Sequence, residues 1–194
     1  IFLAAMQAIP RDVIEAAKTK PYGFTPYYPG PGVGGHCIPV DPLYLAWKAE
    51  QFQFETQFIA LAKKINDAMP DYVIQRLAQR LAKPLAEARI LVIGLTYKKD
   101  VNDLRESRAF VIFERLAETV GHLAYHDPLV AEVEARGKVY RSVPLDEGEL
   151  SRFDGVLILT DHSPIDYQLL KEKAPFILDT RGVFKEWAAH IELL

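Results

Sequence analysis

The sequence predicts an α/β protein in which a helical domain over residues 1–84 is followed by a doubly wound, mostly parallel Rossmann-like sheet over residues 85–194. Two observations support this fold class. Apolar residues recur every three to four positions over residues 43–81, which is the spacing of an amphipathic helix. From Arg89 onward, short apolar stretches alternate with helical stretches, which is typical of parallel strands joined by helices.

The helical domain has three predicted elements. Residues 1–6 are apolar and lack the basic start of a signal peptide, so we expect them to be the interior of a helix that begins outside this sequence. A short helix is expected over residues 12–18. Residues 43–81 are expected to be helical almost throughout, with a kink or a new helix start at Pro70.

The sheet domain is predicted from alternating strands and helices. Strands are expected at residues 89–94, 123–128, 138–143, 155–161 and 176–179. Helices are expected at residues 107–120, with Gly121 as a C-cap, at residues 130–136, ended by Gly137, and at residues 167–173. Because helices separate successive strands, we expect the strands to run in parallel with helices on both faces of the sheet.

Polar residues follow four of the predicted strands, at positions 94–99, 126–127, 160–162 and 179–181. Open parallel sheets bind ligands at the carboxyl ends of their strands, so we expect a ligand there. Lys98 is the best candidate for a phosphate contact, because its amine is a compact point charge. We expect His126 and His162 to hold loops through hydrogen bonds, since their spacing does not indicate a metal site.

The most distinctive stretch, residues 28–42, surrounds the only cysteine of the chain. Four glycines occupy the eight positions before Cys37, and two prolines stiffen the approach, so we expect a loop of fixed shape that presents the thiol. Pro39 and Pro42 suit the first turn of a helix. Cys37 would then lie at a helix N-terminus, where the helix dipole and free N–H groups favour a thiolate.

Two neighbours of the thiol could take part in chemistry. Asp41 lies four residues after Cys37, where a carboxylate could orient water or accept a proton, and His36 is a second candidate base. The alternative is that Cys37 is a small buried hydrophobic residue without a chemical role.

The composition excludes several classes of protein. Apolar residues make up 49% of the 194 positions, which is ample for a core, and a net charge of −3 gives no reason to expect nucleic acid as a partner. A single cysteine rules out an internal disulfide framework and fits a reducing cytoplasm. No apolar run approaches the roughly 20 residues that span a bilayer, so no membrane association is expected.

Two motifs resemble a known family. Residues 28–42 are similar to the catalytic-cysteine motif of the UDP-glucose/GDP-mannose dehydrogenases, which oxidise nucleotide sugars at C6, and residues 94–107 resemble the opening of that family's UDP-binding domain. His36 and Val40 stand where the UDP-glucose branch more often has serine and lysine, so the resemblance favours the branch that acts on UDP-N-acetyl-hexosamines.

The resemblance implies an NAD-dependent, four-electron oxidation of the sugar C6 alcohol to a uronate, through a thiohemiacetal and a thioester on Cys37, with water oriented by Asp41. It assigns a set of residues to the UDP-sugar: Tyr28, Pro29, Gly30, Pro31, Gly32, Val33, Gly34, Tyr97, Lys98 and Arg181. It assigns four to the NAD cofactor: Gly35, Cys37, Val40 and Arg105. It also implies a homodimer, formed through a long central helix that the helical segment resembles.

The family places an NAD-binding domain before the position of Ile1, and no Gly-x-Gly-x-x-Gly following a strand occurs in this sequence. We therefore expect the chain to be a C-terminal piece that is inactive alone, whereas UDP binding by the piece is left open.

Other interpretations remain at this point. The enzyme could act on UDP-glucose or GDP-mannose, or the chain could be a non-catalytic nucleotide-binding or dimerisation module. A cysteine hydrolase or acyltransferase using Cys37 with His36 or His162 is a further alternative. Two assigned residues could instead form ion pairs with sequence neighbours, Arg105 with Glu106 and Arg181 with Asp179.

Overall fold

The computed structural model describes residues 10–185 and 188–194, so the helix expected over residues 1–6 lies outside the described residues. The first elements along the chain are the helices α2 (Pro10–Ala17), α3 (Cys37–Glu50) and α4 (Gln57–Arg80) and the short 3-10 helix η1 (Leu85–Glu87). The strands are β1 (Arg89–Ile93), β2 (His122–His126), β3 (Glu132–Ala135), β4 (Lys138–Arg141), β5 (Gly155–Ile158), β6 (Ile177–Asp179) and β7 (Ile191–Leu193). The later helices are α5 (Arg108–Thr119), α6 (Glu147–Leu150) and α7 (Tyr167–Lys173).

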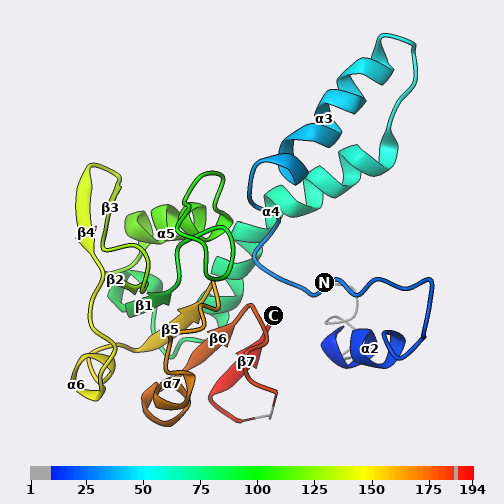
Figure 1. The fold of residues 1–194 in the computed structure, drawn as a ribbon. Helices are drawn as coiled ribbons and strands as arrows, with labels where there is room; N and C mark the ends of the chain where they lie inside the picture. The colour runs from blue at the N-terminus through cyan, green and yellow to red at the C-terminus, as the bar shows by residue number, and fades with distance from the viewer. Residues whose placement is uncertain (1–9, 186–187) are drawn as a thin grey trace.

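The main sheet has five strands in the order β2-β1-β5-β6-β7, and every neighbouring pair is parallel (Figure 1). Alternate residues of β1 face opposite sides, as the pleat requires. Ile90 and Val92 pack with α5 and the C-terminal half of α4, whereas Leu91 and Ile93 pack with α6 and α7. Helices therefore cover both faces, and the predicted doubly wound α/β fold is confirmed.

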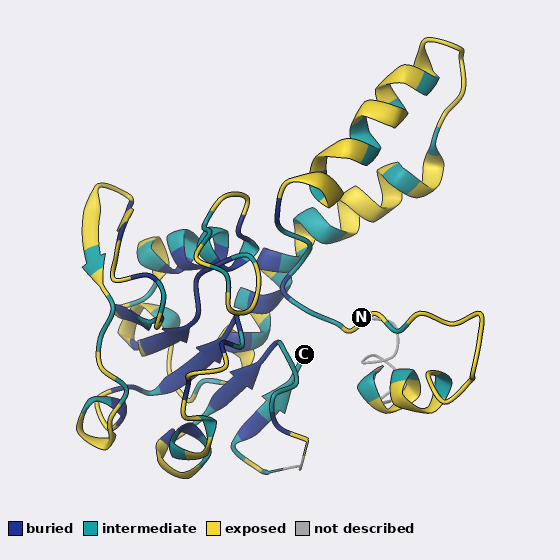
Figure 2. Cartoon of the chain, viewed as in Figure 1, coloured by how far each residue is buried: buried dark blue, intermediate teal, exposed yellow. Residues whose placement is uncertain are grey.

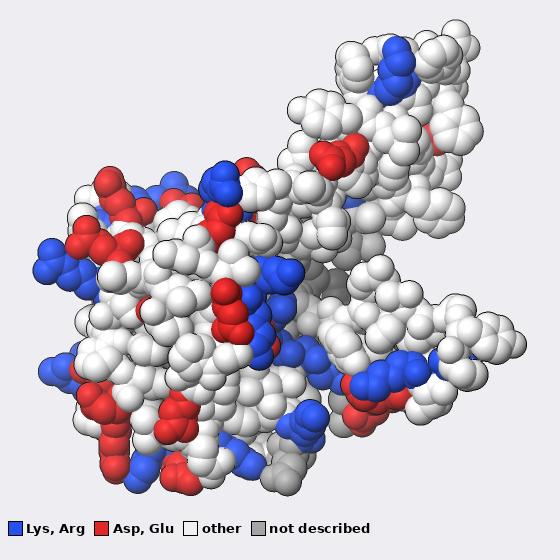
Figure 3. Space-filling view, viewed as in Figure 1, with Lys and Arg blue, Asp and Glu red and all other residues white. Residues whose placement is uncertain are grey.

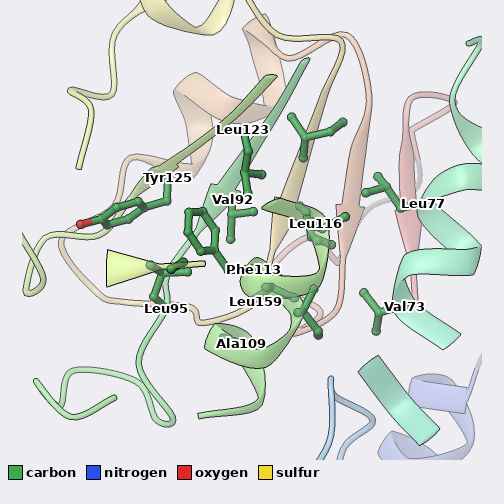
Figure 4. Packing of buried hydrophobic residues seen from close by; sticks show 14 of the residues in the cluster. Val73, Leu77, Val92, Leu95, Ala109, Phe113, Leu116, Leu123, Tyr125 and Leu159 are labelled. Atoms are coloured by element: carbon green, nitrogen blue, oxygen red, sulfur yellow. The ribbon is translucent and has the colours of Figure 1, made fainter. Parts of the chain in front are cut away.

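The core on the α5 side is built around aromatic rings (Figure 4). Phe113 meets Tyr125 edge to face, with ring centroids 5.6 Å apart and an interplanar angle of 80°. Val73 and Leu77 bring α4 into this core, and both are fully buried. The C-terminal half of α4 is thus fixed to the sheet, which gives the other half a rigid base.

The α3–α4 hairpin projects away from the sheet (Figure 1), and most of its surface is exposed (Figure 2). The long helical run of the sequence is interrupted between Glu50 and Gln57, where Gln53 has a positive φ of 60°. Pro70 lies inside α4 and does not start a new helix. Among the described residues, no helix has both the length and the apolar character needed to cross a membrane.

Two local predictions are wrong. Residues 130–136 are not a helix: β3 pairs with β4 in an antiparallel hairpin, and both residues of the connecting turn, Arg136 and Gly137, have positive φ values of 52° and 73°. Gly121 is not a left-handed C-cap, because α5 ends in an extended Val120 and the φ of Gly121 is not positive. A Cβ at Gly121 would instead lie 2.4 Å from the carbonyl oxygen of Ala86, so glycine is needed there for close packing.

Candidate active site

A buried aspartate anchors the carboxyl edge of the sheet. Asp127 follows β2, and its Oδ2 accepts a 2.7 Å hydrogen bond from the amide of Leu95, which follows β1. Its Oδ1 accepts hydrogen bonds from the amides of Leu129 and Val130 at 2.8 and 3.1 Å. Burial alone would raise the pKa of Asp127, but the hydrogen bonds from His162 and the backbone outweigh burial and lower this pKa. Asp127 is therefore an ionised group that draws the ends of two strands together.

His162 holds the turn that follows β1. The ring is fully buried, and its Nδ1 accepts a 2.9 Å hydrogen bond from the amide of Asp100. Its Nε2 lies 3.1 Å from Thr96 Oγ1, whose own proton goes to the carbonyl oxygen of Lys98 at 2.9 Å. The neutral ring therefore carries its proton on Nε2 and fastens both ends of the turn that carries Tyr97 and Lys98.

Asp179, at the end of β6, is also buried, and burial raises its pKa. Its carboxylate accepts hydrogen bonds from the amides of Arg181, Gly182 and Phe184 at 2.9, 2.8 and 3.0 Å. It does not pair with the guanidinium of Arg181, which lies 3.1 Å from Asp161 Oδ1 through Nε. The alternative in which Arg181 forms an ion pair with Asp179 is therefore wrong. Asp179 instead holds the backbone that positions Arg181.

The glycine loop before Cys37 packs directly on this edge of the sheet. A Cβ at Gly30 would lie 3.0 Å from Arg181 Nη1, and one at Gly34 would lie 2.7 Å from the carbonyl oxygen of Glu106. Gly35 has a φ of +90°, and a Cβ there would lie 3.0 Å from the ring of Tyr97. Glycine is required at positions 34 and 35 because the backbone there runs against the sheet domain, whereas Gly30 lies against the flexible end of Arg181. The structure thus brings the loop together with Tyr97 and Arg181.

The start of the loop contacts α2. The hydroxyl of Tyr28 donates a 2.8 Å hydrogen bond to Glu15 Oε1, and the carbonyl oxygen of Pro29 accepts one of 3.3 Å from Arg11 Nη2. The guanidinium of Arg11 also fills the space where Gly182 lacks a side chain. Arg11, which the sequence analysis missed, therefore links α2 to the carboxyl edge of the sheet.

Cys37 is the first residue of α3 and is exposed, so it is not a buried hydrophobic residue. The N-cap His36 makes no side-chain capping bond, which leaves the first N–H groups of the helix without a side-chain partner there. Val40 lies on the first turn of α3 and Asp41 lies one turn after Cys37, and both are exposed. A cavity of about 320 Å³ lies between α3 and α4; Ile38, Asn66 and Arg108 line it, whereas Cys37 does not.

Arg105 pairs with Asp103 and not with Glu106. Its Nε lies 3.0 Å from Asp103 Oδ1 and its Nη2 lies 2.8 Å from Oδ2, and this pairing lowers the pKa of Asp103 to about 2. The Arg105 side chain is nonetheless 74% exposed. Asp103 Oδ2 also lies 3.9 Å from Nε2 of His36. His36 and Arg105 therefore both lie beside the carboxylate of Asp103.

Lys98 is exposed, and its amine has no ion pair or hydrogen bond within residues 10–185 and 188–194. Lys99 Nζ lies 3.9 Å from Asp161, which also pairs with Arg181. Basic side chains gather beside the hollow between the hairpin and the α2 segment (Figure 3). The carboxyl edge thus offers positive charge that the protein does not itself neutralise.

Two further residues contact the middle of the loop and were missed in the sequence. Asn66 Oδ1 accepts a hydrogen bond from the amide of Val33, and Arg108 Nε donates one to the carbonyl oxygen of Val33. These contacts span 33 and 75 positions, and no local pattern in the sequence signals them.

Comparisons with known proteins agree with this arrangement. Residues 2–68 match the UDP-glucose/GDP-mannose dehydrogenase family, central domain, and residues 91–186 match the UDP binding domain of the same family. The chain is 35% identical over 154 residues to the UDP-N-acetyl-D-glucosamine 6-dehydrogenase of Pseudomonas aeruginosa, covering 78% of this chain and 36% of that protein. It is 33% identical over 166 residues to a UDP-N-acetyl-D-mannosamine dehydrogenase of Methanococcus maripaludis, covering 81% and 36%.

Solved structures with this fold include the UDP-D-ManNAc dehydrogenase of Pyrococcus horikoshii, with a TM-score of 0.79 and 26% identity over 99% of this chain and 45% of that one. The UDP-N-acetyl-mannosamine dehydrogenase of Staphylococcus aureus gives a TM-score of 0.72 and 30% identity over 99% and 44%. The chain thus spans about 36% of the length of the curated relatives described above. On the strength of both domain matches, the chain belongs to the UDP-glucose/GDP-mannose dehydrogenase family.

Proposed function

We propose that the chain supplies the thiol and the sugar-nucleotide site of an NAD-dependent dehydrogenase that oxidises C6 of a UDP-N-acetyl-hexosamine to the uronate. One observation carries the proposal: exposed Cys37 begins α3 at the end of a glycine loop that packs on Tyr97 and lies against Arg181. The names of the relatives favour an N-acetylated hexosamine over glucose or mannose. In this proposal, residues 1–84 form the thiol-bearing central domain and residues 85–194 form the UDP-sugar-binding domain.

The nucleotide sugar would lie along the carboxyl edge of the sheet. The free amine of Lys98 suits a diphosphate, and the guanidinium of Arg181 lies where the loop begins, beside Gly30. The backbone of residues 28–34, with its glycines, allows a sugar to approach closely before the chain reaches Cys37. This orientation directs the sugar from the charged edge toward the thiol.

In the proposed reaction, the sulfur of Cys37 adds to the C6 aldehyde of the substrate and forms a thiohemiacetal. Loss of a hydride from C6 gives a thioester, which water then hydrolyses to the carboxylate and the free thiol. Asp41, exposed one helical turn after Cys37, would orient that water and accept its proton. A thiolate suits both roles, because it adds to a carbonyl and later leaves.

NAD, when bound, accepts one hydride in each of the two oxidations. Arg105 fits one of its phosphates, because the guanidinium is mostly exposed and Asp103 engages only Nε and Nη2. Gly35, Cys37 and Val40 would border the same ligand. The chain has no glycine fingerprint after a strand, so its residues fit only one edge of a dinucleotide.

The proposal is tested by Cys37→Ser in the intact enzyme of which we expect this chain to be part. We expect UDP binding, measured by calorimetry, to match that of the unmodified enzyme, and uronate formation to be lost. A variant that made uronate at the normal rate would contradict the proposed role of the thiol. Normal UDP binding by an unmodified enzyme that never reduced NAD would favour the non-catalytic module instead.

A further inference from the structure

Both backbone polar groups of Val33, in the middle of the glycine loop, are held by side chains from other elements. Its amide donates a 3.1 Å hydrogen bond to Asn66 Oδ1 on α4. Its carbonyl oxygen accepts a 3.0 Å hydrogen bond from Nε of Arg108, the first residue of α5. Val33 lies four residues before Cys37, so these bonds fix the loop close to the thiol.

The two side chains are themselves held in place. Arg108 Nη2 pairs with Asp67 Oδ1 at 2.8 Å, and Lys63 shares the same carboxylate. The bond from Lys63 and then that from Arg108 lower the pKa of Asp67, so the carboxylate is charged. Asn66 Nδ2 donates to the carbonyl oxygen of Ala62 at 2.9 Å. The guanidinium therefore bridges the loop, α4 and α5 with charge-assisted bonds, which are stronger than neutral ones.

The loop is shaped to receive Arg108. Gly32 has a φ of +114°, and a Cβ there would lie 3.3 Å from Arg108 Cγ and 3.1 Å from the carbonyl oxygen of Asn66. The aliphatic part of the Arg108 side chain thus lies against Gly32, where a larger residue would leave it less room. Ser107, which precedes Arg108, is buried and donates a 2.6 Å hydrogen bond to the carbonyl oxygen of Leu95, just after β1.

We propose that Arg108 and Asn66 are positioning residues, which hold the glycine loop in the conformation that presents Cys37 to the sugar. The inference rests on the proposed function for the role of the thiol. Glycine-rich backbone has many accessible conformations, so a loop with four glycines needs external contacts to keep one shape. A nucleophile misplaced by about 1 Å can lose a factor of about 100 in rate, so such contacts matter for catalysis.

We call the bonds from Asn66 and Arg108 to Val33 the clamp. Hydrogen exchange in the full chain tests whether this clamp holds the loop, and it needs no assay of activity. Arg108→Ala should make the amide of Val33, which is hydrogen-bonded to Asn66, exchange about tenfold faster, because a hydrogen bond from a charged group to the same residue is lost. Arg115→Ala is the matched control, since Arg115 also joins α5 to α4 through an ion pair with Asp71 but does not contact the loop. Exchange in the loop of Arg115→Ala should match that of the unmodified chain.

A second pair of variants tests Asn66 in case Arg108→Ala does not fold. Asn66→Ala should release the amide of Val33, whereas Asn66→Asp keeps an acceptor oxygen and should restore much of its protection. In the intact enzyme, Arg108→Ala should lower kcat more than it changes KM for the UDP-sugar.

Loop exchange that is the same in Arg108→Ala, Asn66→Ala and the unmodified chain would overturn the inference, whatever the enzyme does. Faster loop exchange with an unchanged kcat would also overturn it, because the clamp would then not position the thiol. An unmodified enzyme that never oxidises a UDP-sugar would instead contradict the proposed function. The exchange data would still show whether the clamp exists.

Discussion

The charge of Lys98 does not contribute to ion pairing within the described part of the protein. Its amine has no partner among the described residues, yet its backbone is fixed because Thr96 Oγ1 donates to its carbonyl oxygen and His162 holds the turn. A charged group on a rigid turn loses little conformational freedom outside its own side chain when a ligand binds. This combination favours a role in binding an anion over a role in stability.

We therefore expect Lys98→Ala to weaken UDP binding by about tenfold or more, since hydrogen bonds to charged groups contribute about 1.5–3 kcal/mol. Isothermal titration calorimetry with UDP measures this directly. Lys83→Ala is the control, because Lys83 pairs with Asp154 just before β5, at the opposite edge of the sheet. Equal affinities for Lys98→Ala and Lys83→Ala would contradict the assignment of Lys98.

The residues that sequence reasoning could find differ from those it could not. Cys37 and Lys98 stand in motifs whose local composition predicts the roles that we propose for them. For Arg105 the sequence offers its neighbour Glu106 as a partner, but Glu106 adopts a positive φ of 51° and the guanidinium folds back onto Asp103. The contact of Arg108 with Val33 depends on how two domains pack, so no window of sequence contains it.

At the scale of elements, the β3–β4 hairpin explains the clearest error. The stretch 132–136 contains glutamate, alanine and arginine, which favour a helix, and this composition suggested one. Yet exposed and buried residues alternate strictly from Glu132 to Ala135, which is the strand period. Arg136 and Gly137 form the turn of the hairpin, and both have positive φ values. Such a turn suits a β-hairpin and is incompatible with a continuous helix.

Gly137→Ala should lower the free energy of unfolding by about 1 kcal/mol, because left-handed backbone disfavours a Cβ by roughly that amount. A Cβ at Gly137 would meet nothing within 4 Å, so backbone strain is the whole effect. Gly137→Asn should cost less, since asparagine adopts this region more readily. Urea denaturation compares the two variants, and equal stabilities for both and for the unmodified chain would contradict this account of the turn.

For the molecule as a whole, the parallel sheet and its helices could be predicted, but the arrangement around it could not. Strand alternation indicates βαβ units, whereas the three-residue β7 is too short to show a period and was missed. The path of α4 also follows from packing. Its C-terminal half is buried on the sheet through Val73 and Leu77, while Phe58 near its start is 89% exposed. One helix therefore joins the core to a projecting hairpin.

That hairpin exposes several large apolar side chains. Its exposed apolar side chains are Tyr44, Leu45, Trp47, Phe52, Phe54, Phe58, Leu61 and Ile65. Exposed apolar patches of this kind mark interaction sites. A second copy of the chain is the partner we propose, because two identical hairpins would cover each other's apolar faces in a twofold arrangement.

Phe58→Asp tests this pairing, because Phe58 is 89% exposed on the hairpin and the variant places a charge on its apolar surface without touching the sheet or its core. We expect size-exclusion chromatography with light scattering to give twice the 21.9 kDa chain mass for the unmodified chain and a shift toward the single mass for the variant. Val139→Asp is the control, since Val139 is also exposed, at 54%, but lies on β4 outside the hairpin surface. Since Phe58 is remote from the Tyr125 core, both variants should keep the thermal unfolding of the sheet, so that a change in mass reports association alone. An unmodified chain that stays at 21.9 kDa at high concentration would contradict the proposed pairing.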